Sequence, residues 1–274
     1  MSAERTVGVI GLGLVGRAIA ARLQAAGFEV LGWDKSPEAL RAFEGTTTEA
    51  AKRAGRIVLA VFDTVDVEQA VKECSASVYV DCTTGDPKRI EALARSLAGR
   101  DIVYVEAPLS GSSEAIRRGE ATMFVGGDAA GCEDLLAAIS ARRHAVGAVG
   151  MAARAKLATN LVLGLNRAAL AEAMVFAETL GIERRRFLDL YKDSPAMSAA
   201  ALAKGEKMVS CDFAPESRIR QHLKDVQRIR QYAAGALPLT EAHEKLLAEA
   251  VAAGDGELDN AAIIRRWGPE RGGR

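Results

Sequence analysis

Thr6-Val7-Gly8-Val9-Ile10-Gly11-Leu12-Gly13-Leu14-Val15-Gly16 runs from an apolar, strand-like segment into a glycine-rich turn, and a helical pattern follows it to Leu23. The glycines after the strand form a GxGxxG pattern. Its first glycine permits a tight turn, the second lets backbone amides approach a pyrophosphate, and the third lets the helix pack close to the strand. The helix N-terminus then presents unpaired N–H groups to the phosphates. We therefore expect a dinucleotide to bind at Gly11, Leu12, Gly13, Leu14, Val15 and Gly16.

The next apolar segment, residues 29–33, ends at Asp34, eighteen residues after Gly16. A carboxylate at this position accepts hydrogen bonds from the free ribose diol of NAD and repels the 2′-phosphate of NADP. Lys35 follows directly, and its positive charge would favour that phosphate. The sequence therefore favours NAD, with NADP as the alternative. The alternative is a tight strand-to-helix turn that binds nothing, but the strand, the helix and the acidic residue around the glycines favour a bound dinucleotide.

The composition is that of an ordinary globular protein. The chain has 274 residues, of which 49% are hydrophobic, so it can bury a sizeable core in two domains. Lys plus Arg and Asp plus Glu number 36 each, which leaves no net field to attract nucleic acid or an anionic membrane. No apolar run approaches the roughly 18 residues of a membrane span, and no secretory signal pattern opens the chain. We expect a small-molecule partner, no nucleic acid, no membrane and a cytoplasmic location.

Four cysteines are scattered through the chain without CxxC or zinc-ligand spacing. This usage is typical of buried thiols in a reducing cytoplasm, and no metal site is expected. The four are Cys74, Cys82, Cys132 and Cys211.

Strand-like runs and helical patterns alternate along the first half of the chain, which predicts a Rossmann-type α/β domain with a mainly parallel sheet. After Gly150 an alanine-rich, proline-free helical pattern covers residues 152–180, and nothing beyond it resembles a strand. We therefore expect a dinucleotide-binding domain at 1–150 and an all-helical substrate and oligomerisation domain at 151–274. The expected later strands are 56–62, 77–82, 102–105 and 122–125, and the expected later helices are 183–192, 196–208, 216–235, 238–253 and 259–266.

Ligands of parallel sheets lie at the carboxyl ends of the strands. Phe62 and Thr84 stand at the ends of two expected strands. We therefore expect both residues to contact the cofactor.

The loop 106–113 also follows an expected strand, and it is rich in serine and glycine. Its hydroxyl groups and backbone amides can bind a carboxylate without a basic side chain. The expected substrate-binding residues of this loop are Ser110, Gly111 and Ser112. The alternative is that a serine caps a helix near residues 114–118.

Two pairs of polar residues in the second half of the chain could take part in chemistry. Lys156 and Asn160 stand four apart near the start of the long helix, so they project from the same face about one turn apart. Burial would lower the pKa of a lysine there toward the range in which it exchanges protons. The second pair is Lys224-Asp225, and for both pairs the alternative is a solvated helix face. Three isolated histidines are expected to be structural or exposed: His144, His222 and His243.

Taken in order, the motifs resemble those of the β-hydroxyacid dehydrogenase family, the group that includes 3-hydroxyisobutyrate, tartronate semialdehyde and threonate enzymes. The resemblance runs nearly from end to end of the chain. Six ordered motifs are far more specific than a single glycine turn. The matching segments are Val9 to Gly16, Asp81 to Pro87 (DCTTGDP), Ala107 to Gly111 (APLSG), Gly150 to Asn160 (GMAARAKLATN), Lys224-Asp225 and Asp259 to Arg265 (DNAAIIR).

The resemblance implies a fold and a set of roles. The implied fold is a Rossmann domain followed by an all-helical domain, as in 6-phosphogluconate dehydrogenase, with the helical domain closing a cleft. Lys156 is then the general acid/base at the substrate hydroxyl, and Asn160 orients the substrate beside it. A homodimer or homotetramer is also implied. The further implied roles are Ser110 and Gly111 at the substrate carboxylate, Thr84 at the nicotinamide, Lys224 at the cofactor and Asp225 at the substrate.

Three departures from the family pattern bear on the substrate. Ser112 replaces the second glycine of a usual Ser-Gly-Gly, Thr159 replaces the first of two asparagines, and Ala152 stands where glycine is common. The added hydroxymethyl group of Ser112 would make the pocket smaller or more polar, which favours a more hydroxylated acid than 3-hydroxyisobutyrate.

We therefore expect an NAD(P)-dependent oxidoreductase that interconverts the 3-hydroxyl of a short, polar 3-hydroxy carboxylic acid with the 3-oxo acid or semialdehyde. An imine reductase-like enzyme and a non-catalytic cofactor-binding module of the same fold are the alternatives. The presence of Lys156 with Asn160 counts against both, because such relatives generally lack the lysine.

Overall fold

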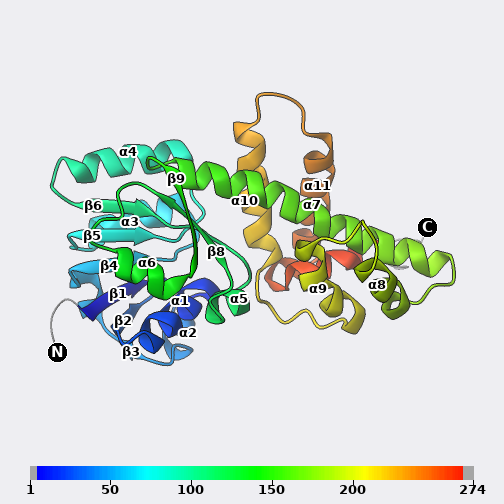
Figure 1. Ribbon diagram of the computed structural model, residues 1–274, viewed down its shortest axis with the longest axis horizontal. Coiled ribbons are helices and arrows are strands. Elements are labelled where there is room, and N and C mark those ends of the chain that lie inside the picture. The colour runs from blue at the N-terminus through cyan, green and yellow to red at the C-terminus, as the bar shows by residue number, and fades with distance from the viewer. Residues whose placement is uncertain (1–4, 268–274) are drawn as a thin grey trace. The chain divides into compact units, whose positions relative to one another are not determined.

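A sheet covered by helices forms the first part of the chain, and the described residues of the second part are mainly helical (Figure 1). The computed structural model describes residues 5–267. The chain divides into two compact units, Met1–Lys156 and Leu157–Arg274. The division falls inside one long helix, slightly beyond the boundary expected at residue 150.

The described residues of the first unit form one sheet, and its neighbouring strands are mainly parallel. The strands in the described part of this unit are β1 (Thr6–Ile10), β2 (Glu29–Trp33), β3 (Thr46–Thr47), β4 (Arg56–Leu59), β5 (Val78–Asp81), β6 (Val103–Glu106), β7 (Leu109–Ser110), β8 (Thr122–Gly126) and β9 (Arg142–Gly147). Their order is β3-β2-β1-β4-β5-β6-β8-β7, with β9 paired to β8. The chain moves outward from β1 to β3 and returns to the other side of β1 at β4. Winding therefore reverses between β1 and β4, which is where parallel α/β sheets bind ligands at their carboxyl ends.

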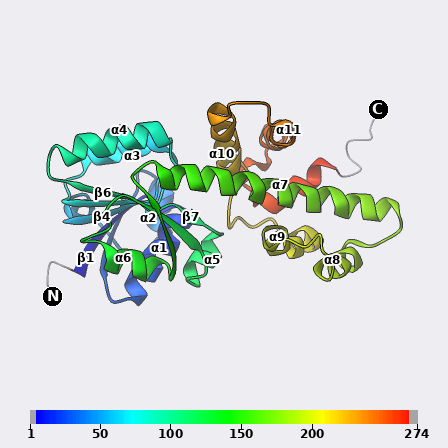
Figure 2. The ribbon, with the colours of Figure 1, turned by 45° about the horizontal axis from the view of Figure 1, so that its top comes forward.

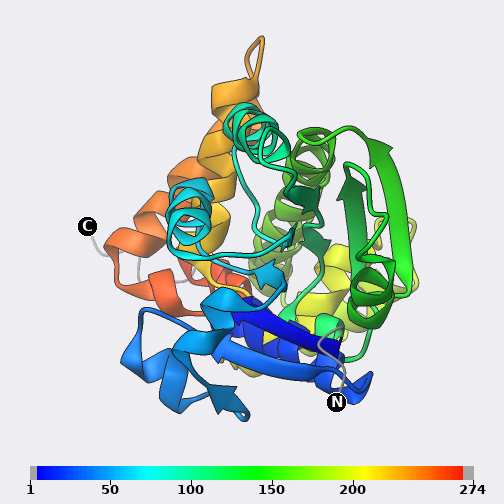
Figure 3. The same ribbon diagram turned by 90° about the vertical axis from the view of Figure 1, so that its left-hand side faces the viewer.

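Helices cover both faces of this sheet. They are α1 (Leu14–Ala25), α2 (Pro37–Arg41), η2 (Glu49–Arg53), α3 (Thr64–Glu73), α4 (Pro87–Ala98), α5 (Ser113–Arg117) and α6 (Glu133–Ile139). α3 and α4 lie on one face, and α1, α5 and α6 lie on the other (Figure 2). Figure 3 shows these layers from another side, with the cyan helices α3 and α4 and the green helix α6 on opposite sides of the strands. The expected Rossmann-type domain is confirmed.

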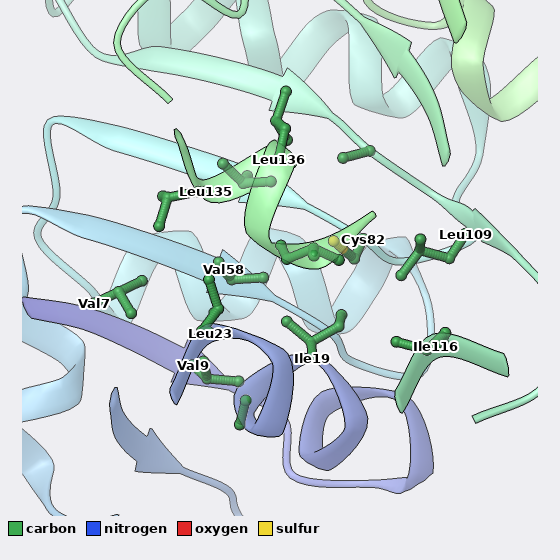
Figure 4. Close-up of a cluster of buried hydrophobic side chains, with 14 of the residues drawn as sticks. Val7, Val9, Ile19, Leu23, Val58, Cys82, Leu109, Ile116, Leu135 and Leu136 are labelled. Atoms are coloured by element: carbon green, nitrogen blue, oxygen red, sulfur yellow. The ribbon is translucent and has the colours of Figure 1, made fainter. Parts of the chain in front are cut away.

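Alternation of side chains along the strands builds a core on each face. Val7 and Val9 of β1 point to the face where Ile19 and Leu23 of α1 pack (Figure 4). Ile10 belongs instead to the core on the face of α3 and α4. Successive strand residues point to opposite faces, so a strand buried on both faces is apolar throughout. Full burial of each such side chain stabilises the fold by roughly 1.5–3 kcal/mol.

Three strands were not expected from the sequence. β3 and β7 have two residues each, too few for a period-2 pattern. β9 begins Arg-Arg-His and is largely exposed, so it lacks the apolar run that marked the other strands. Pairing with β8 forms this strand, and such a pairing is a tertiary contact.

The long helix α7 (Met151–Thr179) follows β9 and crosses the division between the units. Its bounds agree closely with the helical pattern at residues 152–180. By length and composition alone it could span a membrane, but 44% of its most apolar window is buried inside the structure. The core helix of a globular domain passes the same test.

The described part of the second unit contains helices and one isolated β-bridge, as the absence of strand patterns predicted. Its further elements are α8 (Arg184–Lys192), α9 (Ala199–Ser210), α10 (Ile219–Tyr232), α11 (Pro238–Ala252), η3 (Asp255–Glu257) and η4 (Asn260–Arg266). The last segment is a 3₁₀ helix, tighter than the α-helix that the periodicity suggested. All four residues from Ala261 to Ile264 are buried, whereas an amphipathic α-helix would bury one face.

The cysteines only partly fit the expectation of buried thiols. Cys82 and Cys132 are buried, Cys74 is half-buried, and Cys211 is exposed at the end of α9. The expectation was wrong for Cys211 because this residue lies just beyond α9, as its C-cap in a left-handed conformation.

Candidate functional site

The glycine turn between β1 and α1 has the geometry that its pattern predicts. A Cβ atom at Gly11 would lie 2.4 Å from the carbonyl oxygen of Ala60, and its φ of +94° is one that side chains disfavour. A Cβ atom at Gly16 would lie 1.8 Å from the Gly11 carbonyl oxygen. Gly13 faces open space, with no heavy atom within 4 Å of the Cβ position. Gly11 and Gly16 are therefore required for packing, whereas Gly13 leaves room for a ligand.

The N-terminus of α1 has free space and uncapped backbone N–H groups that can bind an anion. Gly13 is its N-cap, so no side chain caps the first N–H groups, and the first turn carries no acidic residue. Uncapped N–H groups at the positive end of a helix bind phosphate. This end of α1 therefore fits a pyrophosphate.

Asp34, at the end of β2, is bonded to the glycine turn. Its Oδ2 accepts a hydrogen bond from the Leu12 amide at 2.6 Å, and its Oδ1 accepts one from the Ser36 amide at 2.8 Å. Each carboxylate oxygen keeps a further lone pair, which a ribose diol could use. Lys35 is directed elsewhere, because its Nζ lies 2.7 Å from the Asp66 carboxylate, and that hydrogen bond raises the pKa of Lys35.

The ends of β4 and β5 bring two further predicted residues to the same edge of the sheet. The Val61 amide donates to the Thr83 hydroxyl at 3.2 Å, which links the segments after these strands. Phe62 is 39% exposed, and Thr84 is half-buried. Both residues therefore lie at the carboxyl edge of the sheet. Phe62 follows β4, the neighbour of β1, and Thr84 follows β5, the next strand along.

The loop after β6 is partly ordered by its own hydrogen bonds. Ser110 ends the short strand β7, and Gly111 has a φ of +153°. The Ser112 hydroxyl oxygen accepts a hydrogen bond from the Ala115 amide at 3.2 Å and so caps α5. The structure thus shows the capping role that was the alternative for this loop. Ser112 can still donate its hydroxyl proton to a ligand.

The start of α7 is fixed by Glu106, the last residue of β6. This buried carboxylate accepts hydrogen bonds from the amides of Gly150 at 2.5 Å, Ala153 at 3.1 Å and Ala152 at 3.3 Å. Burial raises the pKa of Glu106 to about 7, and the hydrogen bonds from these amides act in the opposite direction. Glu106 therefore attaches the helix that carries Lys156 to the carboxyl edge of the sheet.

Sequence reasoning did not assign a role to Glu106. An acidic residue at the end of an apolar strand was the available signal, because a buried carboxylate needs partners of the kind that a helix N-terminus supplies. Lys156 lies on the second turn of α7 and is buried, so its side chain is not part of a solvated helix face.

In the second unit, α7 and α10 bring three predicted residues together. Asn160 Nδ2 donates to Asp225 Oδ2 at 2.9 Å, and both side chains are buried. Lys224 Nζ lies 3.3 Å from Asp225 Oδ1. The alternative that Lys224-Asp225 is an exposed pair is therefore wrong, because α10 packs this step inward.

Further buried polar residues lie on α7, α10 and α11, and the sequence did not indicate that they are buried. The rings of His222 on α10 and His243 on α11 lie 5.2 Å apart, and Gly164 of α7 packs against both. Arg167 of α7 is also buried. Burial, and then the charge of Arg167, lower the pKa of His243 to about 4.

The first unit also has a hollow of about 860 Å³. It is lined by α4, the start of β6 and the first turn of α7, including Glu91 and Arg154, which form an ion pair. It contains no predicted site residue. The residues that fit a dinucleotide are those of the glycine turn and the carboxyl edge of the sheet, and none of them lines this hollow.

Two family models match the chain and together cover most of it. Residues 6–150 match the NAD binding domain of 6-phosphogluconate dehydrogenase. Residues 150–267 match a domain described as NAD-binding of NADP-dependent 3-hydroxyisobutyrate dehydrogenase. Both descriptions concern NAD(P), and they do not distinguish NAD from NADP.

Individual relatives match over nearly the full length. The chain is 28% identical to an L-threonate dehydrogenase of Cupriavidus necator, over 96% of each chain. It is also 28% identical to a probable 3-hydroxyisobutyrate dehydrogenase-like protein of Arabidopsis thaliana, over 94% of this chain and 92% of the relative. A solved 3-hydroxyisobutyrate dehydrogenase of Salmonella typhimurium has the same fold, with a TM-score of 0.85 at 23% identity over 95% of this chain and 99% of that one.

Proposed function

Because this chain belongs to the β-hydroxyacid dehydrogenase family and is an NAD(P)-dependent hydroxyacid dehydrogenase, we propose that it interconverts the 3-hydroxyl of a short, polar 3-hydroxy acid with the 3-oxo acid or semialdehyde. The observation that carries this proposal is the placement of Lys156. This buried lysine lies on the second turn of α7, and Glu106 attaches the first turn to the carboxyl edge of the sheet. Cofactors of Rossmann domains bind at that edge.

We assign cofactor binding to residues 1–150 and substrate binding with oligomerisation to residues 151–274. The chain's own groups fit a dinucleotide, since Gly13 leaves space at the uncapped N-terminus of α1. NAD is the favoured form. A hydrogen bond from the Leu12 amide to Asp34 supports a role for Asp34 at the ribose, while Asp66 draws Lys35 into an ion pair.

The proposed mechanism divides the work between cofactor and protein. A bound nicotinamide supplies hydride transfer at the hydroxyl-bearing carbon. In the oxidative direction Lys156, as the neutral amine, removes the hydroxyl proton, and in the reductive direction its ammonium returns the proton. Ser110 and Gly111 bind the substrate carboxylate, and Asn160 orients the hydroxyl group.

The polarity of the substrate rests on Ser112 and on one relative. The Ser112 side chain adds a hydroxyl group to the loop that the family resemblance places at the substrate. The L-threonate dehydrogenase relative acts, by its name, on a polyhydroxylated acid. Both observations favour an acid with additional hydroxyl groups.

The imine reductase-like enzyme and the non-catalytic module remain the alternatives. Lys156 and Asn160 are both present and both buried, and a cofactor-binding module would have no use for this pair. We propose a cytoplasmic enzyme that works as a homodimer or homotetramer.

The proposed oligomer forms through α7, between copies of this chain. Val162 and Phe176 of α7 are 55% and 62% exposed, and Leu180 directly after the helix is 62% exposed. Val162 and Phe176 stand fourteen residues apart, which is two heptads, and Leu180 follows four residues later. The exposed Ala158 and Ala169 leave room beside them. This alternation of large and small side chains suits a second copy of the same helix.

A screen with NAD and NADP tests the proposed reaction. The acids to be tested are threonate, erythronate, glycerate, 3-hydroxyisobutyrate and 3-hydroxypropionate. We expect the protein to reduce the cofactor with at least one of the polar acids. Lys156→Ala should lower kcat by about 10²- to 10⁴-fold, the usual contribution of a general acid/base, with NADH affinity and Tm retained. Lys192→Ala, which removes a lysine on the surface helix α8, is the matched control and should keep full activity. Near-normal turnover by Lys156→Ala would exclude the acid/base role.

A further inference from the structure

An ion pair in the first unit joins the two segments that flank the glycine turn. Lys35 follows β2, and Asp66 lies in the first turn of α3, the helix that follows β4. β1, which leads into the turn, lies between β2 and β4 in the sheet. Lys35 Nζ lies 2.7 Å from Asp66 Oδ1. The pair therefore connects the two sides of the edge at which we place the cofactor.

Lys35 is the cation of this segment that could recognise NADP. It directly follows Asp34, the carboxylate that we assign to the ribose, and a cation there would attract a 2′-phosphate. The next cation along the chain, Arg41 of α2, pairs with Glu38 of its own helix at 3.3 Å. The Lys35 side chain is 75% exposed, so packing does not hold it. The pair with Asp66 therefore determines where the charge of Lys35 lies.

Three carboxylates outnumber this lysine. Asp34 accepts hydrogen bonds from two backbone amides, and Asp63 caps α3 by accepting two more. The hydrogen bond to Asp66 raises the pKa of Lys35 more than burial lowers it, and the charges of the three carboxylates raise it further. The net charge of the group is therefore negative at neutral pH. A 2′-phosphate, with a charge of about −1.5 to −2, would be repelled, whereas the uncharged diol of NAD would not.

We propose that Asp66 is a specificity-determining residue, which selects NAD over NADP by pairing with Lys35. The pair withholds the lysine from a 2′-phosphate, and the carboxylate adds repulsion of its own. The diol of NAD needs no cation, because its hydroxyl groups donate to Asp34. Selection of this kind opposes the wrong ligand and adds no contact to the right one. The inference rests on the cofactor site of the proposed function.

Cofactor binding measures this effect without turnover. In the full-length protein, titrations with NADH and NADPH, followed by cofactor fluorescence, give the two dissociation constants. Asp66→Asn should tighten NADPH binding by about tenfold, since it removes one repulsive charge and frees one attractive charge, each worth about two- to fivefold at an exposed site. NADH affinity should stay within about twofold, and Tm should not change, because exposed ion pairs contribute little to stability. Unchanged NADPH affinity would overturn the proposal.

A double variant shows whether Asp66 acts through Lys35. Lys35→Met/Asp66→Asn has the net charge of the native protein but lacks the ion pair. It should return NADPH affinity to within about twofold of the native value, since residues of one ion pair do not act additively. A double variant that binds NADPH much more weakly than the native protein would show that Lys35 already reaches the phosphate. One that keeps the tenfold gain would show that Asp66 acts without Lys35. Either result overturns the proposal.

Glu68→Gln is the matched control on the same helix. Glu68 of α3 pairs with Arg89 of α4 at 2.6 Å, and its side chain is 28% exposed, against 26% for Asp66. The substitution therefore removes the same charge from a pair that does not involve Lys35. Both cofactor affinities should stay within about twofold. A gain in NADPH affinity equal to that of Asp66→Asn would mean that overall surface charge, and not the pair with Lys35, sets the preference.

The binding data separate this proposal from the proposed function. If no hydroxy acid is turned over but NADPH affinity responds to Asp66→Asn as expected, the reaction assignment fails and the role of Asp66 stands. If a hydroxy acid is turned over and NADPH affinity does not respond, the reaction stands and the role of Asp66 fails. A native protein that binds NADPH as tightly as NADH would contradict the selection of NAD itself.

Discussion

At the scale of single residues, the three glycines of the turn differ in what they do. A side chain at Gly11 or Gly16 would collide with backbone atoms of the fold itself, whereas one at Gly13 would enter open space. The requirement at Gly11 and Gly16 is therefore structural, and that at Gly13 concerns a ligand. Asp34 combines both kinds of requirement, because it holds the Leu12 amide and is also the residue expected at the ribose.

Asp34→Ala should raise the KM for NAD by about 10- to 100-fold. Hydrogen bonds to a charged group contribute about 1.5–3 kcal/mol each, and those from the ribose diol would be lost. Initial rates at varied NAD and NADP concentrations measure this change. The Tm of the variant shows whether the substitution also destabilises the glycine turn. Lys35→Ala is the neighbouring control and should change the KM for NAD little, since Lys35 is engaged by Asp66. A native preference for NADP would contradict the assignment.

At the scale of elements, the contact between β6 and α7 determines where the helix that carries Lys156 begins. Glu106 supplies the carboxylate that the first turn of α7 lacks, because no side chain within that turn is acidic. The helix that carries Lys156 therefore starts at a defined point on the sheet. The neighbouring strands support this edge, since Tyr104 of β6 donates a hydrogen bond to the buried Asp81 of β5.

The Glu106 contact should make stability depend on pH. The pKa of Glu106 is about 7 in the folded protein against a usual 4.5, so the folded state holds the extra proton between these values. Stability due to Glu106 is therefore full below about pH 4.5 and declines as the pH rises to 7. Relative to Glu106→Gln, the free energy of unfolding of the native protein should fall by up to about 3 kcal/mol between pH 5 and 8. Urea titrations across this range measure the difference, and a constant difference would show that the contact is independent of ionisation.

At the scale of the whole molecule, we expect copies of the chain to associate through α7. Val162→Glu and Phe176→Glu place charges on its exposed apolar face and should shift the protein toward monomer in sedimentation experiments, because buried unpaired charges oppose association. Leu239→Glu, at an exposed apolar residue of α11, should leave the assembly unchanged. A native protein that sediments as a monomer at micromolar concentration would contradict this interface.

Local sequence predicted the helices and strands in which hydrophobic residues recur with a clear period. The apolar strand before Gly11 and the proline-free segment that became α7 were found because period-2 and period-3.6 patterns are properties of neighbouring residues. β9 was missed because its residues are polar and exposed, and only pairing with β8 makes it a strand. The final 3₁₀ segment was assigned as an α-helix because its complete burial depends on helices distant in sequence.

The sequence by itself determined the family, the parallel sheet and the position of the glycine turn, and it singled out Lys156 and Asn160 as candidate site residues. Short contiguous motifs carry each of these signals. Tertiary structure alone decided which side chains share a hydrogen bond or a charge. Glu106 bonds to residues 150–153, and Asn160 bonds to Asp225, across separations of tens of residues. Buried polar groups depend on partners that folding brings together, and no local pattern encodes those partners.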